Sequence, residues 1–370
     1  MVRVYGSVVE VDKPDGSLTP ALLLDPAKLD ANIARLNDRL ARFPGVALRP
    51  HLKTAKCAEA ARRATAGRSG AITVSTLAEA EHFLAAGFTD ILYAVPVAPA
   101  KLARAEALAH AGAALTLLVD SVAAAEAVAA SPHPFPTLVE IDVDGNRGGA
   151  KPDAPPLPKI AGALGGRLAG VLAHAGGSYA KRGPAALAVH AEQERAGAVA
   201  AAERLRAAGH ACRTVSIGST PTILFAEDLT GITEVRPGVY MFMDLVMAGL
   251  GVCRPDDIAI SVIASVIGHR PDGRVLVDAG WMALSRDRGT ATHEVDQGYG
   301  LVVGTEDVIV AETNQEHGIL ARRDGGPLDP AAFPIGSLVG ILPNHACATA
   351  AQHGRYHLPD GTIWERVSGW

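Results

Sequence analysis

Eight short apolar runs, each typical of a buried strand, recur between residues 46 and 238, and a stretch with helical spacing follows most of them. The runs lie at 46–53, 72–75, 91–95, 115–120, 137–144, 168–175, 214–219 and 232–238. They are apolar on both faces, as parallel strands are when helices cover both sides of the sheet. Eight successive strand–helix units predict an α/β fold, a (β/α)8 barrel of the TIM type. A doubly wound open sheet is the alternative, and we favour the barrel.

The pattern changes after about residue 250, where strand-like runs follow one another without long helices. Strand-like runs that follow one another without long helices are typical of a mostly β domain. We therefore predict two domains, a barrel over residues 21–250 and a β domain built from residues 1–20 and 251–370. The first 20 residues, which include VRVYGSVVEV, are expected to pair with the β domain or to cover the base of the barrel.

The composition argues against several classes of function. The chain has 370 residues, a net charge of -5 and no basic stripe, which argues against nucleic acid as a partner. No apolar run is long enough to span a membrane, and the N-terminal residues lack the pattern of a signal peptide. The four cysteines are scattered, so that we expect free thiols and a cytoplasmic location.

A lysine ends the first predicted strand. The stretch VALRPHLKTAKC, residues 46–57, places Lys53 at the carboxyl end of that strand, where barrel enzymes keep their active sites. A lysine that is partly removed from water there can act as an amine nucleophile. The alternative is a solvated lysine at a strand end. We interpret Lys56 in that second way, as a solvated residue in the first turn of the next helix.

Two later loops contain the residues that a phosphate group requires. In SIGSTPT, residues 216–222, small residues leave backbone N–H groups free to face an anion, and Ser219 and Thr220 add hydroxyls. Gly238 and Val239 offer further N–H groups in RPGVY. These loops follow the seventh and eighth strands, where barrels often bind phosphate. Ordinary turns are the alternative.

A lysine beside a phosphate loop suits a cofactor that carries both an aldehyde and a phosphate. Pyridoxal 5'-phosphate (PLP) is such a molecule, and proteins hold it through a lysine. Arg147 follows the fifth strand and could meet the pyridine nitrogen or form a surface ion pair. In the loop HAGGSY after the sixth strand, His174 could face the ring or pack in the core, and Tyr179 lies nearby in sequence.

A histidine and a cysteine near the C-terminus could bind a metal. His345 and Cys347 lie two residues apart in PNHACATAAQH, and in an extended run both side chains would point to one side. Imidazole and thiolate suit Zn²⁺, and few protein ligands would leave the ion open to substrate. The alternative is that Cys347 is a small buried apolar residue.

These blocks together resemble a known family. RPHLKTAK, ITVSTLAEAEHF, IDVDGNRGG, SIGSTPT, EVRPGVYMFMD, VDAGWMALSRDRG and PNHACATAAQ occur in this order over nearly the whole chain. They are similar to the D-serine dehydratase and D-threonine aldolase family, PLP enzymes of the alanine racemase fold type. The resemblance implies that Lys53 carries the cofactor covalently and acts in catalysis. It implies a cofactor site that also contains Arg147, Tyr179, Ser219, Thr220, Gly238 and Tyr240, the last four around the phosphate.

The resemblance also implies a reaction. His345 and Cys347 would be the metal ligands, for Zn²⁺ or Mn²⁺. Aldolases of the family usually show H-x-D at this position and dehydratases show H-x-C, so that the H-A-C of this chain favours a dehydratase. The implied function is a homodimeric lyase that converts D-β-hydroxy amino acids, such as D-threo-3-hydroxyaspartate or D-serine, into a 2-oxo acid and ammonia. An aldolase, an amino-acid racemase and a non-catalytic PLP-binding protein are the alternatives.

Overall fold

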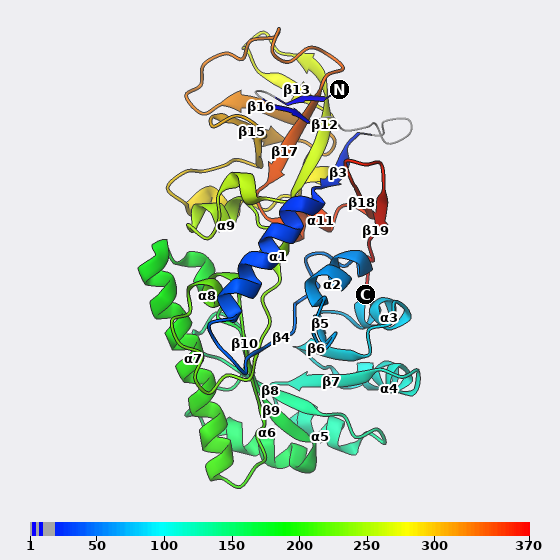
Figure 1. Ribbon diagram of the computed structural model, residues 1–370, viewed down its shortest axis with the longest axis vertical. Helices are drawn as coiled ribbons and strands as arrows, with labels where there is room; N and C mark the ends of the chain where they lie inside the picture. The colour runs from blue at the N-terminus through cyan, green and yellow to red at the C-terminus, as the bar shows by residue number, and fades with distance from the viewer. Residues whose placement is uncertain (1, 5–6, 10–18) are drawn as a thin grey trace. The chain divides into compact units, whose positions relative to one another are not determined.

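The computed structural model describes residues 2–4, 7–9 and 19–370 (Figure 1). Contacts between residues divide the chain into two compact units. The barrel unit consists of Arg35–Gly238 and Val367–Trp370, and the β unit consists of the described residues up to Ala34 together with Val239–Arg366. Helix α1 (Pro26–Leu40) crosses the division between them. Among the described residues, no helix is both long enough and apolar enough to cross a membrane.

Eight parallel strands form the barrel, which confirms the predicted fold. They are β4 (Ala47–Leu48), β5 (Ile72–Val74), β6 (Asp90–Pro96), β7 (Ala114–Val119), β8 (Thr137–Ile141), β9 (Leu168–Ala173), β10 (Thr214–Ile217) and β11 (Glu234–Val235). In the sheet, β4 lies next to β11 and the remaining strands follow in reverse order down to β5. Beyond the end of β4, the N–H of Leu52 donates to the carbonyl of Thr73 (2.8 Å) and the N–H of Thr73 donates to the carbonyl of Pro50 (2.9 Å), so that the sheet curls back on itself.

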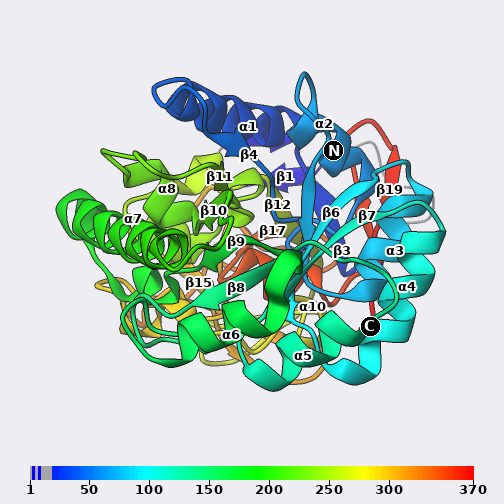
Figure 2. The same cartoon turned by 90° about the horizontal axis from the view of Figure 1, so that it is seen from below.

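Helices surround these strands in the view from below (Figure 2). They are α2 (Ala58–Thr65), α3 (Leu77–Ala85), α4 (Leu102–His110), α5 (Val122–Ala130), α6 (Pro156–Leu164), α7 (Gly183–Ala207) and α8 (Thr220–Phe225), with short 3-10 helices η1 (Pro99–Lys101), η2 (Gly165–Arg167) and η3 (Gly176–Ala180). Local chemistry sets several helix starts. Thr76 accepts the N–H of Glu79 at the start of α3, and Ser121 caps α5 in the same way.

The β unit is built on a nine-stranded sheet. Its strands are β3 (Ala21–Leu24), β12 (Ile260–His269), β13 (Val275–Val277), β14 (Gly300–Val302), β15 (Val308–Thr313), β16 (Gly318–Arg322), β17 (Leu338–Pro343), β18 (Arg355–His357) and β19 (Ile363–Glu365). Short helices connect them, namely η4 (Val239–Met241), α9 (Leu245–Gly249), η5 (Pro255–Asp257), α10 (Trp281–Leu284), η6 (Gly289–Thr292) and α11 (Ala346–Ala350). Most pairings are antiparallel, and buried and half-buried residues alternate along most of β12, as is common in antiparallel sheets with one face on the core.

The two units divide the chain at other residues than the domains predicted above. Residues 21–34 and 239–250, predicted in the barrel, group with the β unit instead, and residues 367–370, predicted in the β domain, group with the barrel unit. The reason is strand pairing, since β3 joins β12 in the second sheet. Of the first 20 residues, β1 (Val2–Val4) pairs with β2 (Ser7–Val9) and contacts β17 of the β unit. The remainder of that prediction lies outside the described residues.

Candidate active site

The loops at the carboxyl ends of the barrel strands carry most of the predicted site residues. Lys53 follows β4, Arg147 follows β8, His174 and Tyr179 follow β9, Ser219 and Thr220 follow β10, and Gly238 follows β11. Because all eight strands are parallel, these carboxyl ends lie at one end of the barrel. The fold therefore brings residues together that are far apart in sequence.

Lys53 lies beside two half-buried histidines, His51 and His174. Its backbone N–H is 3.4 Å from Nδ1 of His51. Burial lowers the pKa of both His51 and His174 well below 6.5, and in each case the charge of Lys53 is the next cause. Nδ1 of His174 lies 2.6 Å from the carbonyl oxygen of Gly218 and must donate to it, so that its Nε2 is an acceptor. Both imidazoles are therefore neutral at neutral pH.

Two glycines allow the loops after β10 and β11 to approach their neighbours. A Cβ on Gly238 would lie 2.8 Å from the carbonyl oxygen of His51. Gly218 has φ +144°, and a Cβ there would lie 2.7 Å from the backbone nitrogen of Arg236. Any side chain at either position would push the loops apart.

The loop after β10 presents uncharged polar groups. Ser219 is the N-cap of α8, and its Oγ accepts the N–H of Thr222 (3.3 Å). The same Oγ lies 3.0 Å from Ser178 Oγ and 3.0 Å from Thr222 Oγ1. Thr220, the first residue of α8, is buried. Hydroxyls and backbone groups, without a lysine, make up this loop.

The remaining predicted cofactor residues differ in their exposure. Arg147 is exposed, and Tyr179 is half-buried in η3. Tyr240 is fully buried in η4, which belongs to the β unit. The structure thus groups all of the predicted cofactor residues except Tyr240 in the barrel unit.

The interpretation of Lys56 as a solvated residue in the next helix is wrong. Its Nζ lies 3.1 Å from a carboxylate oxygen of Glu79, a side chain that is only 1% exposed. Lys56 has φ +46°, and α2 begins only at Ala58. Its carbonyl oxygen accepts the N–H of Val367. Lys56, three residues after Lys53, is therefore held both by this hydrogen bond and by the ion pair with Glu79.

Sequence reasoning missed a chain of polar groups inside the barrel. Arg236 is buried and donates to Ser216 Oγ and to the carbonyl of Ala173. Ser216 in turn donates to Glu234 (2.6 Å), whose other oxygen accepts from Arg49 (2.6 Å). Burial lowers the pKa of Arg236 to about 10. The sequence did contain a signal for this chain of polar groups. Residues 234 and 236 are two apart along β11 and its extension, so that both side chains face the same side of the strand.

A buried glutamate on β8 also escaped the sequence analysis. Glu140 is 7% exposed, and burial raises its pKa to about 7. The charges of Arg147 and Arg236 oppose this shift. Perturbed carboxylates of this kind gather at functional sites.

The predicted metal ligands lie in the β unit. His345 is the N-cap of α11, in extended conformation, and Cys347 lies in the first turn of that helix. The expectation that both residues belong to one extended run is wrong, because the helix begins at Ala346. The two side chains nevertheless interact, since a hydrogen bond with Cys347 is one cause of the raised pKa of His345.

Asp287 orients His345. Its carboxylate lies 2.6 Å from Nδ1 of the imidazole. Burial lowers the pKa of His345, but the hydrogen bonds with Asp287 and Cys347 outweigh it and raise the value to about 11. Within the described part of the chain, no group of three His, Cys, Asp or Glu side chains is placed to hold a metal ion. The predicted ligands at this position are one imidazole and one thiol.

Comparisons with known proteins place this geometry in a family. Residues 24–246 match the family model described as "Alanine racemase, N-terminal domain", and residues 259–358 match "Putative serine dehydratase domain". The chain is 52% identical to D-threo-3-hydroxyaspartate dehydratase of Delftia sp. (strain HT23), over 95% of this chain and 98% of that protein. The chain belongs to the D-serine dehydratase and D-threonine aldolase family.

Other members of the family are more distant in sequence. D-serine dehydratase of Dictyostelium discoideum is 30% identical, over 92% of this chain and 93% of its own. D-threonine aldolase of Arthrobacter sp is also 30% identical, over 94% and 91%. A solved structure of D-threo-3-hydroxyaspartate dehydratase superposes on this chain with a TM-score of 0.93 at 51% identity. The match covers 97% of this chain and 100% of that one. That structure is of a mutant with one cysteine replaced by alanine, described as the metal-free form.

The residues of this family member fit both groups that the sequence implied. At one end of the barrel, an amine that could bind an aldehyde lies in the same set of loops as hydroxyls and glycine-rich backbone that could bind a phosphate. In the β unit, an imidazole whose Nδ1 is held by a carboxylate would present Nε2 to a metal that displaces the proton this nitrogen carries in the metal-free protein, which is the usual arrangement of metal-binding histidines.

Proposed function

We propose that the protein is a PLP- and metal-dependent dehydratase that converts D-β-hydroxy amino acids, such as D-threo-3-hydroxyaspartate or D-serine, into a 2-oxo acid and ammonia. The observation that carries this proposal is the 52% identity to D-threo-3-hydroxyaspartate dehydratase over nearly the full length of both chains. The H-A-C arrangement of His345 and Cys347 supports the same branch of the family.

Lys53 is assigned the proton chemistry at Cα. We propose that it holds PLP, which when bound supplies a sink for the charge that develops at Cα. Lys53 then removes the Cα proton as general base. His174 stays neutral beside it, because burial and the charge of Lys53 lower its pKa. A neutral ring does not repel a protonated lysine.

The rest of the barrel site is assigned to binding the cofactor. Ser219, Thr220 and Gly238 bind the phosphate with hydroxyl and backbone donors, and Tyr240 is assigned to the same group. Arg147 is assigned to the pyridine nitrogen and Tyr179 to the neighbourhood of the ring. The short loop after β10 supports the phosphate assignment, since it carries only uncharged donors.

His345 and Cys347 are assigned to the metal, for which Zn²⁺ is proposed and Mn²⁺ is the alternative. A metal at this position would supply a Lewis acid for departure of the β-hydroxyl, which is otherwise a poor leaving group. Asp287 keeps the imidazole oriented through Nδ1. Loss of the Cα proton and of hydroxide removes one water, and the released enamine hydrolyses to the 2-oxo acid and ammonia.

Product analysis tests this proposal. The protein is incubated in parallel with D-threo-3-hydroxyaspartate, D-serine and D-threonine, and ammonia, 2-oxo acid and glycine are measured. We expect ammonia and oxaloacetate from the first substrate. Glycine with an aldehyde would instead show the aldolase reaction, the second candidate, which the match to D-threonine aldolase favours. Borohydride reduction followed by peptide mapping should place the cofactor on Lys53.

The surroundings of the enzyme are part of the same proposal. We propose a homodimer, which sedimentation would test. We also propose a cytoplasmic location, because none of the four cysteines forms a disulfide, as is usual in a reducing compartment.

A further inference from the structure

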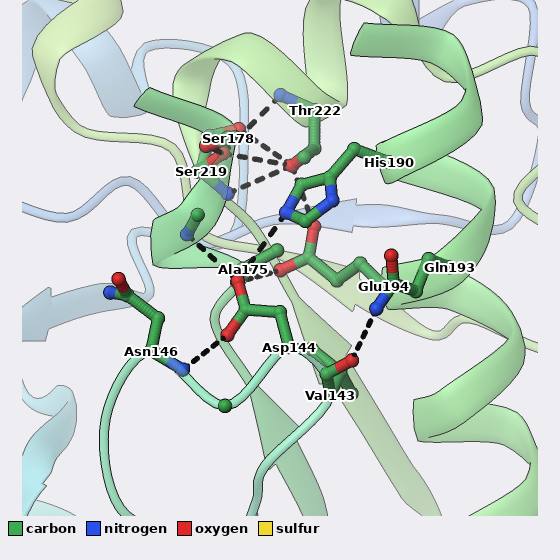
Figure 3. Close-up of polar contacts among 12 residues, drawn as sticks. Val143, Asp144, Asn146, Ala175, Ser178, His190, Gln193, Glu194, Ser219 and Thr222 are labelled. Atoms are coloured by element: carbon green, nitrogen blue, oxygen red, sulfur yellow. Dashed lines mark hydrogen bonds and ion pairs between the residues drawn. The ribbon is translucent and has the colours of Figure 1, made fainter. Parts of the chain in front are cut away.

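One face of helix α7 reaches three of the loops that carry the proposed cofactor residues (Figure 3). His190, Gln193 and Glu194 lie three and four residues apart, so that they share one side of the helix. The loops that they contact follow β8, β9 and β10. None of the three side chains has a role in the proposed chemistry itself.

Glu194 makes the largest share of these contacts. Its side chain is fully buried, with an exposed fraction of 0%. Oε1 accepts the N–H of Ala175 (2.9 Å), which follows β9, and the N–H of Gly218 (3.1 Å), which follows β10. Oε2 accepts the hydroxyl proton of Thr222 (2.6 Å) in α8. One carboxylate therefore joins two strand ends and a helix.

The contacts of Glu194 continue directly into the proposed phosphate loop. Thr222 Oγ1 accepts the N–H of Ser219 (3.2 Å) and lies 3.0 Å from Ser219 Oγ. Ser219 Oγ in turn lies 3.0 Å from Ser178 Oγ. Since Thr222 has a single hydroxyl proton and gives it to Glu194, it can only accept from Ser219. The carboxylate thus decides how the groups of Ser219 are arranged.

Glu194 also fixes the peptide group next to His174. The N–H of Gly218 is held by Glu194, and its carbonyl oxygen accepts from Nδ1 of His174 at 2.6 Å. Both the N–H and the carbonyl of Gly218 therefore form hydrogen bonds. Gly218 has φ +144°, in the left-handed range that glycine adopts easily. Because glycine has no side chain, its backbone can adopt other conformations when one of these hydrogen bonds is lost.

The other two residues of the face hold the loop after β8. Gln193 Nε2 donates to the carbonyl of Val143 (2.8 Å), and His190 Nε2 lies 3.3 Å from Asp144. Asp144 also accepts the N–H of Gly177 (2.7 Å) and so connects this loop to the loop after β9. The same helix face therefore supports the whole group of loops, with Glu194 nearest to the phosphate residues.

We propose that Glu194 is a positioning residue for the cofactor phosphate, which acts by holding the ends of β9 and β10 and the hydroxyl of Thr222 in one arrangement. This inference rests on the proposed function, since it takes the loop of Ser219 as the phosphate site. It predicts that the identity of residue 194 governs affinity for the phosphate part of PLP and not for the pyridine part.

The test compares PLP with pyridoxal, which lacks the phosphate. Full-length protein is stripped of cofactor and titrated with each compound, for the wild type and for Glu194→Gln. Glutamine keeps the shape but has a single acceptor oxygen, so that it cannot accept both the proton of Thr222 and the two N–H groups of Ala175 and Gly218. We expect the dissociation constant for PLP to rise at least tenfold, which corresponds to about 1.4 kcal/mol. The constant for pyridoxal should change less than twofold.

Glu192→Gln is the matched control. Glu192 lies on the same helix, is exposed and pairs with Arg195 at 2.6 Å, so that its replacement should change neither constant. An equal loss of affinity for PLP and pyridoxal in Glu194→Gln would overturn the proposal, because a general loosening of the fold acts on both. So would unchanged PLP affinity in that variant.

A second variant covers the case in which Glu194→Gln does not fold. Thr222→Val removes the hydroxyl that donates to Glu194 and should lower PLP affinity in the same selective way. Where Glu194→Gln does fold, the double variant should lose no further affinity, because both changes remove the same hydrogen bond, whereas additive losses would contradict the mechanism. These measurements need no turnover. A wild-type protein that binds PLP without dehydrating any substrate would refute the proposed function alone.

Discussion

Replacement of Lys56 by methionine should destabilise the barrel and weaken attachment of the cofactor to Lys53. Lys56 pairs with Glu79 at 3.1 Å, and the two side chains are 17% and 1% exposed. Without Lys56, Glu79 keeps neutral donors only, namely the N–H and hydroxyl of Ser75 and the hydroxyl of Thr76. A carboxylate would then remain buried without a counter-charge.

The magnitude follows from the exposure of the pair. Breaking a fully buried pair costs about 3–5 kcal/mol, but here Lys56 is partly exposed and Glu79 retains three hydrogen bonds. We therefore expect a loss of about 2 kcal/mol in the free energy of unfolding. For a unit of this size that corresponds to a fall in Tm of about 4–8 °C. Calorimetry of the full-length protein measures it.

A surface pair provides the control. Arg62 and Glu59 lie 3.5 Å apart and are 55% and 41% exposed, so that Arg62→Met should change stability by less than about 0.5 kcal/mol. Because Lys56 lies three residues from Lys53, Lys56→Met should also lower the yield of the borohydride adduct on Lys53. Equal Tm values for Lys56→Met, Arg62→Met and the wild type would refute this reasoning.

Three further changes test other parts of the molecule. Cys347→Ala should remove bound metal, measured by elemental analysis, and lower dehydration by about two orders of magnitude or more, whereas Cys347→Asp should be milder and prefer Mn²⁺. Burial raises the pKa of Glu140 to about 7, so that between about pH 4.5 and 7 the folded state binds more protons than the unfolded state. The free energy of unfolding should therefore fall by about 3 kcal/mol as the pH rises through this range. Urea unfolding at several pH values measures this fall, and Glu140→Gln should lack the part that Glu140 causes. Gly238→Ala should lower PLP affinity, because its Cβ would lie 2.8 Å from the carbonyl oxygen of His51, and unchanged affinity would show that the loop can move aside.

The strands of the barrel could be predicted because their signal is local. Each of the eight apolar runs overlaps the strand that the structure has there, in most cases with its bounds within a few residues. Parallel pairing then places every residue after a strand at the same end, so that sequence alone groups Lys53 with Ser219. In contrast, β3 was assigned to the wrong unit, since its partner β12 lies more than 200 residues away and no local pattern indicates that pairing.

The supporting carboxylates could not be predicted in the same way. Glu194 occurs in HAEQERAG among charged residues, and such a run usually lies on a solvated helix face. A signal existed, because Leu187, Ala191 and Ala198 share its side of the helix and are buried. A carboxylate in an apolar stripe needs donors from elsewhere. The sequence does not show which loop supplies them.

The two buried glutamates solve the same physical problem on opposite sides of the barrel. Glu79 on α3 accepts the N–H of Ser75 just after β5, and Glu194 on α7 accepts N–H groups just after β9 and β10. A backbone N–H that leaves a strand end has lost its partner in the sheet and must find another. A carboxyl group on the covering helix provides one, and its hydrogen bonds hold the loop in place after the strand. Reactive side chains on loops need such support, and we expect the acid to matter there for cofactor geometry more than for total stability.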